Sequence, residues 1–148
     1  MEVRFEACDA AVQPASDLIA ALLAEYEAPA GRALRGGPSA TPSDFSPPGG
    51  AYLVGFVGDT AVCGAGIKAL LTRIAELKRV YVAPRFRGRG LGTAVLKALE
   101  PAARELGYEV VRIDCPRANW SMYLAAGYRE IADYNNNPHA DIWCEKQL

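Results

Sequence analysis

Residues 85–93 read Arg-Phe-Arg-Gly-Arg-Gly-Leu-Gly-Thr and combine residue types that suit the binding of a phosphate group. Three glycines at every second position leave backbone N–H groups unobstructed, and three arginines supply positive charge. The stretch follows the apolar run Val80-Tyr81-Val82 and precedes a segment with helical periodicity. Because a helix N-terminus carries roughly half a positive charge, this loop predicts a site for a phosphate-bearing ligand.

The spacing of the glycines distinguishes this loop from two common phosphate-binding loops. A Walker A loop needs a longer spacer between its glycines, followed by Gly-Lys-Ser/Thr. The dinucleotide fingerprint G-x-G-x-x-G needs a further glycine where this chain has Thr93. The stretch does fit R-x-x-G-x-G, from Arg85 through Gly88 to Gly90.

Together with the flanking V-Y-V-A-P-R-F-R-G-R-G-L-G, this pattern resembles the acyl-CoA signature of the GNAT superfamily of N-acetyltransferases. The resemblance is strong over residues 76–96, fair over 119–128 and weak before residue 50. It implies that the backbone of Val80, Tyr81 and Val82 holds the pantetheine arm and polarises the thioester. It also implies that the phosphates of coenzyme A contact Arg87, Gly88, Arg89, Gly90, Leu91, Gly92 and Thr93.

Residues 119–128 resemble the second motif of the same superfamily, in which an asparagine precedes a helix that bears a tyrosine. Tyr123 lies four residues before Gly127-Tyr128, so the resemblance implies that its hydroxyl faces the CoA sulfur and protonates the departing thiolate. The alternative for Tyr123 is a buried core aromatic. Asn119 is closer to Tyr123 than is usual in the family, so it is either a CoA contact or a helix N-cap.

Acyl transfer to an amine also requires removal of a proton from the amine, because an alkylammonium has a pKa of about 10.4. Glu76 is the candidate base, since some members of the superfamily carry a catalytic glutamate on this strand that works through water. The alternative is a surface glutamate paired with an arginine. His139 follows Asn-Asn-Asn-Pro and is predicted to be an exposed turn residue. Asp114 ends a strand where a dinucleotide-binding fold would keep its ribose-binding acid.

The hydrophobic pattern predicts a mixed α/β fold. The order of the elements also resembles the GNAT superfamily, which implies a single domain with a mostly antiparallel central sheet flanked by helices. The expected strands cover residues 3–7, 51–57, 60–70, 74–82, 108–115, 128–132 and 141–144. The expected helices cover residues 14–26, 91–106 and 120–126.

One strand of this pattern contains a change of phase. Val80 and Val82 alternate with period two, but Leu77 is out of phase with them. A one-residue bulge near Lys78 and Arg79 would restore the phase. Bulges leave N–H groups unpaired and often occur beside active sites, and the resemblance implies that the backbone after this bulge polarises the thioester.

Residues 27–50 are rich in proline, glycine and serine and show no strong periodicity. They are predicted to form a long mobile surface loop with at most one helical turn, bordering the acceptor site. The loop contains Arg32, Arg35, Asp44 and Phe45, which together indicate no single class of acceptor.

Composition narrows the functional classes. The chain of 148 residues suits one domain, expected to be an acyl-CoA N-acyltransferase over residues 1–148. A net charge of −1 argues against nucleic acid as a partner. No membrane-spanning or signal segment is recognisable. Cys8, Cys63, Cys115 and Cys144 form no C-x-x-C pair, so we expect no metal and reduced, buried thiols in a cytoplasmic protein.

These observations predict an N-acetyltransferase that moves an acetyl group from acetyl-CoA, by direct attack, to a primary amine of a small molecule or peptide. The sequence is compatible with a homodimer. One alternative is a non-catalytic acyl-CoA-binding or sensor module, which would need neither Tyr123 nor Glu76. The other is a dinucleotide-binding domain.

Overall fold

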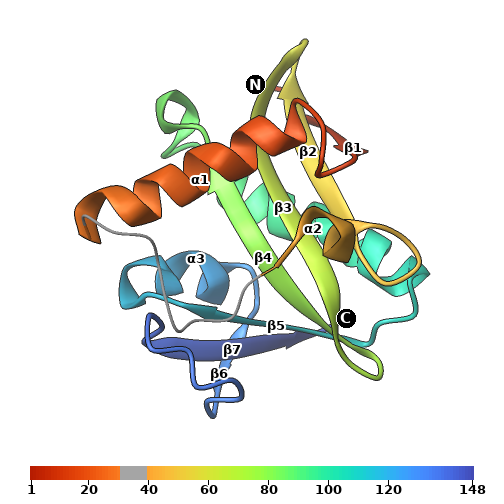
Figure 1. Ribbon diagram of the computed structural model, residues 1–148, viewed down its shortest axis with the longest axis vertical. Coiled ribbons are helices and arrows are strands. Elements are labelled where there is room, and N and C mark those ends of the chain that lie inside the picture. Colours follow the sequence, from red (N-terminus) through yellow and green to blue (C-terminus); the bar gives the residue numbers. More distant parts are fainter. Residues whose placement is uncertain (31–39) are drawn as a thin grey trace.

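The computed structural model describes residues 1–30 and 40–148 (Figure 1). Its centre is one seven-stranded sheet with the strand order β1-β2-β3-β4-β5-β7-β6. All neighbouring strands are antiparallel except β4 and β5, which are parallel. The fold is therefore mixed α/β with a mostly antiparallel sheet, as the hydrophobic pattern and the resemblance together predict.

The strands are β1 (Arg4–Ala7), β2 (Ala51–Val57), β3 (Thr60–Leu71), β4 (Ile74–Val82), β5 (Val110–Cys115), β6 (Arg129–Ile131) and β7 (Ile142–Gln147). The α-helices are α1 (Ala15–Ala30), α2 (Leu91–Glu105) and α3 (Trp120–Ala125). Three short helical turns are η1 (Pro42–Phe45), η2 (Pro84–Phe86) and η3 (Arg117–Asn119). None of the helices in the described ranges has the length and apolar character needed to cross a membrane.

A separate apolar core covers each face of the sheet. Helix α1 lies across one face and α2 across the other (Figure 1). On the α1 face, Leu18 and Leu22 pack in one cluster with Tyr52 and Tyr81. The core on the other face joins α2 and α3 to the sheet through Val95, Leu96, Leu99, Tyr123, Ile67, Leu77 and Val111. The two cores fix both helical layers relative to β4, where the candidate site lies.

A β-bulge interrupts β4 at the predicted place. Gly66 pairs with Lys78, but Gly64 pairs with Tyr81, so β4 contains one extra residue between these pairs. Arg79 takes up this residue with a left-handed φ of 58°. As a result Leu77 and Val80 belong to the same core, and Tyr81 belongs to the core on the opposite face. The predicted bulge is confirmed.

The parallel strands β4 and β5 are paired along only part of their length. Pairing covers Ile74 with Val110, Ala75 with Val111 and Glu76 with Arg112. Beyond Glu76, β4 continues to Val82 and β5 continues to Cys115 with no further pairs between them. The sheet therefore opens between the two strands, and the bulge lies at the edge of this opening.

The predicted loop at residues 27–50 is wrong in part. Helix α1 continues past Tyr26 and ends at Ala30, so the first residues of the predicted loop are helical. Phe45 is only 3% exposed and packs against the ring of Tyr52, and Asp44 accepts a hydrogen bond of 2.8 Å from the Thr41 N–H. Residues 40–50 thus belong to the folded body, and Asp44 and Phe45 have structural roles. Arg32 and Arg35 lie outside the described residues.

The four cysteines are free. Cys63, Cys115 and Cys144 are buried, as predicted, whereas Cys8 is half-buried. Helix α2 runs through Pro101 without ending there.

Candidate active site

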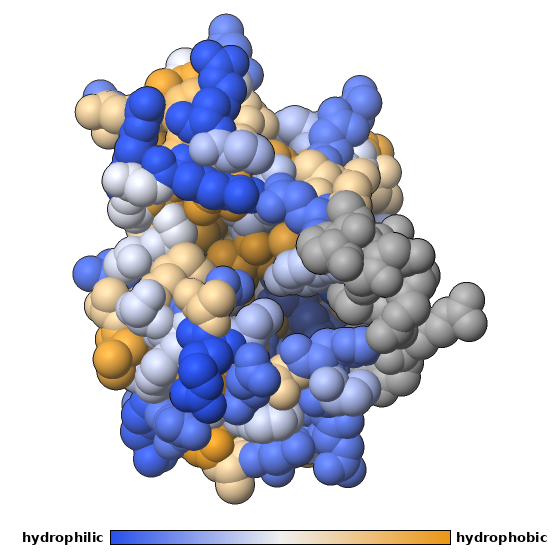
Figure 2. All heavy atoms as spheres, turned by 90° about the vertical axis from the view of Figure 1, so that its left-hand side faces the viewer, coloured by the Kyte–Doolittle hydropathy of each residue, from blue (hydrophilic) through white to orange (hydrophobic). Residues whose placement is uncertain are grey.

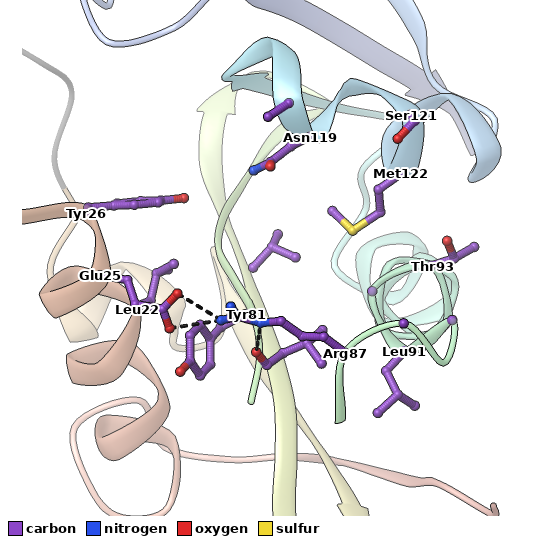
Figure 3. Close-up of a pocket in the computed structure, with 16 residues that line it drawn as sticks. Leu22, Glu25, Tyr26, Tyr81, Arg87, Leu91, Thr93, Asn119, Ser121 and Met122 are labelled. Carbon is purple, nitrogen blue, oxygen red and sulfur yellow. Dashed lines mark hydrogen bonds and ion pairs between the residues drawn. The ribbon is translucent and has the colours of Figure 1, made fainter. Parts of the chain in front are cut away.

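A first cavity of about 530 Å³ lies where α1, β4, the glycine-rich loop and the start of α3 meet. Figure 3 shows its lining side chains, and the face drawn in Figure 2 is hollowed, with apolar side chains inside and hydrophilic ones around. All residues predicted to contact the cofactor line this cavity except Arg89. The lining residues are Leu22, Glu25, Tyr26, Val80, Tyr81, Val82, Arg87, Gly88, Gly90, Leu91, Gly92, Thr93, Ala118, Asn119, Ser121 and Met122.

The glycines of the loop serve two different purposes. Gly88 and Gly90 have φ angles of 77° and 79°, which favour glycine, and a Cβ at either position would meet nothing within 4 Å. Gly90 is the N-cap of α2, so open backbone at a helix start faces this region of the cavity and suits a phosphate group. At Gly92, by contrast, a Cβ would collide with the Met122 sulfur. The third glycine therefore allows α2 to approach α3.

Arg87 connects the loop to α1. Its Nη2 donates to both carboxylate oxygens of Glu25 at 2.9 Å, and its Nε donates to the Val82 carbonyl at 2.8 Å (Figure 3). The guanidinium also lies 5.4 Å from the centre of the Tyr81 ring. Hydrogen bonds from Tyr81 and Arg87 hold the pKa of Glu25 below its ordinary value. Sequence reasoning missed Glu25, because it is 62 residues from Arg87 along the chain.

Arg89 is exposed and lies outside the cavity. Its guanidinium lies 5.6 Å from the centre of the Phe86 ring and contacts the Met1 sulfur at 3.8 Å. Of the two predicted arginine contacts, the structure therefore brings only Arg87 to the cavity.

A second cavity of about 450 Å³ lies in the opening between β4 and β5. It shares Tyr26, Val80, Asn119 and Met122 with the first cavity, so the two adjoin. Its further lining residues are Leu23, Leu77, Lys78, Arg79, Ile113, Asp114, Cys115, Pro116, Tyr123, Asn137, His139 and Ala140. Tyr26, at the end of the helix predicted over residues 14–26, lies at the junction of both cavities and is 38% exposed.

Tyr123 lines the second cavity and also belongs to the core. It is 3% exposed, and its ring packs edge-on against Tyr128 with 5.7 Å between the ring centres. Burial raises the pKa of Tyr123 well above its ordinary value of 10, so the phenol keeps its proton at neutral pH. Asn119 makes no side-chain capping bond at the start of α3, and in Figure 3 its amide points toward the space between Tyr26 and Met122.

Glu76 occupies a different environment from the one predicted. It is only 3% exposed and lines neither cavity. The Tyr134 hydroxyl donates to it at 2.7 Å, and the Lys78 ammonium lies 3.5 Å from its other oxygen. The predicted surface pair with an arginine is therefore wrong, because the side chain points into the α1 face of the sheet and pairs with a buried lysine.

His139 and Asp114 both line the second cavity. The expectation that His139 is exposed is wrong, because the loop between β6 and β7 folds back over the end of β5 and leaves it half-buried. Asp114 accepts a hydrogen bond from the Asn135 amide, and the Trp143 N–H donates to the other end of that amide at 2.8 Å. Asp114 is thus held at the cavity by residues that lie more than twenty positions away.

Comparison with known proteins agrees with this geometry. The model of the Acetyltransferase (GNAT) family matches residues 17–128. A protein assigned as an acyl-CoA N-acyltransferase from Klebsiella pneumoniae has a similar structure, with a TM-score of 0.78 and 27% identity over 99% of this chain and 97% of that one. No curated protein sequence matches the chain.

Two further solved structures share the fold at lower identity. One is an acetyltransferase of the GNAT family from Staphylococcus aureus, with a TM-score of 0.76 and 11% identity over 99% of each chain. The other is an aminoglycoside 6′-N-acetyltransferase in complex with coenzyme A, with a TM-score of 0.72 and 14% identity over 97% of this chain and 96% of that one. Because the family model covers most of the sequence, this chain belongs to the GNAT acetyltransferase family.

Proposed function

We propose that this protein is a single-domain N-acetyltransferase that moves the acetyl group of acetyl-CoA directly to a primary amine of a small molecule or peptide. The observation that carries the proposal is the pair of adjoining cavities that share Tyr26, Val80, Asn119 and Met122. Direct attack requires the acyl donor and the amine to lie side by side. Two cavities that meet at common residues offer this arrangement.

The first cavity suits an acyl-CoA. Its open backbone at Gly88 and Gly90 would hold the pyrophosphate, and the backbone of Val80 to Val82 would hold the pantetheine arm. Arg89, which lies outside the cavity, would add only long-range positive charge. When bound, acetyl-CoA supplies an activated acetyl group as a thioester. The fold shared with a relative solved in complex with coenzyme A supports this proposal.

The amine nitrogen forms the amide bond to the acetyl carbon while the carbon–sulfur bond breaks. Of the two protons that the ammonium loses, one goes to solvent and one to the departing sulfur. Tyr123, which keeps its proton at neutral pH and lines the second cavity, would donate this proton to the sulfur and regain one from the amine. Glu76 would act as a positioning residue that fixes Lys78 and Tyr134.

A non-catalytic acyl-CoA sensor would share the first cavity but would not require the second. A dinucleotide-binding domain would require a parallel, doubly wound sheet, and this sheet has a single parallel pair among its described strands.

The test compares two glycines that share a left-handed backbone and open surroundings. Gly90 lies at the first cavity, and Gly58, with φ 60°, lies in the turn between β2 and β3. We expect Gly90→Ala to weaken acetyl-CoA binding more than tenfold in calorimetry, about 1.4 kcal/mol. Gly58→Ala has the same strain and should leave the affinity unchanged.

The same preparations are then assayed for release of CoA thiol with a panel of primary amines. Release with at least one amine supports the transferase. Tight acetyl-CoA binding without release from any amine would favour the sensor, and binding of NAD in place of acetyl-CoA would overturn both.

A further inference from the structure

The second cavity contains two charged side chains that lack an ion-pair partner among the described residues. Arg79 is the one lysine or arginine in the described part of the chain that is half-buried and makes no ion pair there. Among the described acidic side chains, Asp114 is likewise the one that is half-buried and makes no ion pair with a described residue. The two side chains have opposite charges and line the same cavity.

The other cation of this cavity is already compensated. Lys78 lies 3.5 Å from the Glu76 carboxylate, and both side chains are buried. With the described residues Arg79 makes one side-chain hydrogen bond, from Nη2 to the Ala40 carbonyl at 3.4 Å, and a guanidinium has five N–H donors. Most of its donors are therefore available to a ligand.

The backbone conformation of Arg79 also supports a role in ligand binding. Its φ of 58° is a conformation that glycine adopts at lower cost, and glycine is the usual residue in bulges of this kind. Strain of this type is concentrated at functional sites. An arginine in this conformation places a guanidinium at the opening between β4 and β5, which glycine could not do.

Tyr26 lines the second cavity together with Arg79 and Asp114. Burial is the main cause that raises the pKa of its phenol; the charge of Arg79 lowers this pKa and that of Asp114 raises it. Tyr26 is also one of the residues where the two cavities meet.

We infer that the acceptor is an amine that carries a carboxylate in the same molecule and fits the second cavity of about 450 Å³, for which amino acids are the simplest probes. Its carboxylate lies at Arg79 and its ammonium at Asp114. The guanidinium forms paired hydrogen bonds with a carboxylate, and Asp114 compensates the positive charge of the amine before the amine loses its proton. This inference rests on the proposed function, because it assigns the second cavity to the acceptor.

The experiment uses each amino acid and its carboxamide, which differ in the group that Arg79 would contact. The variants are Arg79→Gln and, as a matched control, Arg73→Gln. Arg73 also has a left-handed φ, of 64°, but lies exposed outside both cavities. The carboxamide amine has a different pKa of its own, but this difference cancels when each variant is compared with the wild type on the same substrate.

We expect Arg79→Gln to lower kcat/KM for the preferred amino acids roughly tenfold to hundredfold, the effect of losing a charge-assisted contact, and to lower it much less for their carboxamides. Arg79→Lys should recover part of the loss. Asp114→Asn should raise KM for both substrates, because both carry the ammonium, whereas Asp59→Asn in the exposed β2–β3 turn should not. A binding readout without acetyl-CoA is the rise in Tm on adding the amino acid, which Arg79→Gln should abolish and Arg73→Gln should keep.

Equal losses on amino acids and carboxamides would overturn the inference. A wild-type preference for amines without an anionic group, or for phosphate-bearing amines such as phosphoethanolamine, would also overturn it, while release of CoA thiol would leave the proposed function standing. Failure of acetyl-CoA to bind, together with no transfer to any amine, would instead overturn the proposed function.

Discussion

The two cavities recognise their ligands in different ways. Most lining residues of the first cavity come from one continuous stretch, residues 80–93, and the others come from α1 and from residues 118–122. The second is lined by residues from α1, β4, β5, residues 116–123 and residues 137–140, which meet only in the folded protein. Backbone N–H groups recognise a feature common to all acyl-CoA molecules, whereas side chains can select among acceptors.

The charges of the two cavities differ as well. At the first, the Arg87 cation is matched by Glu25 at 2.9 Å. At the second, Arg79 and Asp114 make no ion pair with the described residues, although both are half-buried. A ligand at the first cavity must therefore compete for an existing pair, and a ligand at the second can complete unmatched charges.

The strongest test of this division concerns Tyr123, which lies at the second cavity but would act on the sulfur held by the first. We expect Tyr123→Phe to lower kcat by ~10²–10⁴, the usual range for one acid–base group, with little change in acetyl-CoA affinity or Tm. Stopped assays of CoA release measure kcat, calorimetry measures the affinity for acetyl-CoA, and thermal unfolding measures Tm.

The control is Tyr128→Phe, because Tyr128 is the buried ring that packs against Tyr123 and lines neither cavity. It should leave kcat near the wild-type value. Should Tyr123→Phe lower Tm and spare kcat, Tyr123 is a core aromatic, and Tyr26, at the junction of the cavities, becomes the next candidate acid.

A second test concerns the buried ion pair between Glu76 and Lys78, next to the second cavity. Glu76→Gln leaves the buried Lys78 ammonium without its carboxylate, and the loss of one partner of such a pair costs about 3 kcal/mol of unfolding free energy. We expect denaturant unfolding to show this loss and kcat/KM to fall by the same factor at every pH. The double variant Glu76→Gln with Lys78→Met should recover much of the stability. A rate deficit that disappears at high pH would contradict the positioning role and make Glu76 the base.

The contrast between the cavities also explains what could be predicted from the sequence. The glycine-rich loop and the bulge near Arg79 are local patterns, in which spacing and phase along a few residues determine the backbone. Each of them could be predicted before the fold was known. Ten predicted contacts therefore line the first cavity together.

The second cavity could not be predicted in this way, because its residues have no common spacing. Asp114 is held by Asn135, and Glu76 is paired with Lys78 and Tyr134, through contacts that depend on how β5, β7 and the loop before β7 pack. The burial of His139 follows from the same packing. Helix α1 continues past Tyr26 to Ala30 although Pro29 lies in its last turn and the composition there changes to that of a loop, so these local signals predicted too early an end.

The smallest expected effect concerns the pair that joins α1 to the first cavity. Both side chains are nearly half exposed, so the pair is worth roughly 0.2–1 kcal/mol. If Arg87 must leave Glu25 to contact a phosphate, Glu25→Gln should tighten acetyl-CoA binding about twofold to fivefold in calorimetry. Glu6→Gln, which breaks the exposed Arg4–Glu6 pair away from the cavities, should have no effect.

The lowered pKa of Glu25 determines how the effect of Glu25→Gln on acetyl-CoA affinity depends on pH. Tyr81 and Arg87 hold the pKa of Glu25 below its ordinary value of 4.5, so the pair is complete above that value and is lost as the pH falls through the lowered pKa. The wild type and Glu25→Gln should therefore differ in acetyl-CoA affinity at neutral pH and converge below pH 4.5. Weaker binding by Glu25→Gln at neutral pH would show instead that Glu25 holds Arg87 in its binding position, so that the first cavity, like the second, depends on a side chain brought from a distant part of the chain.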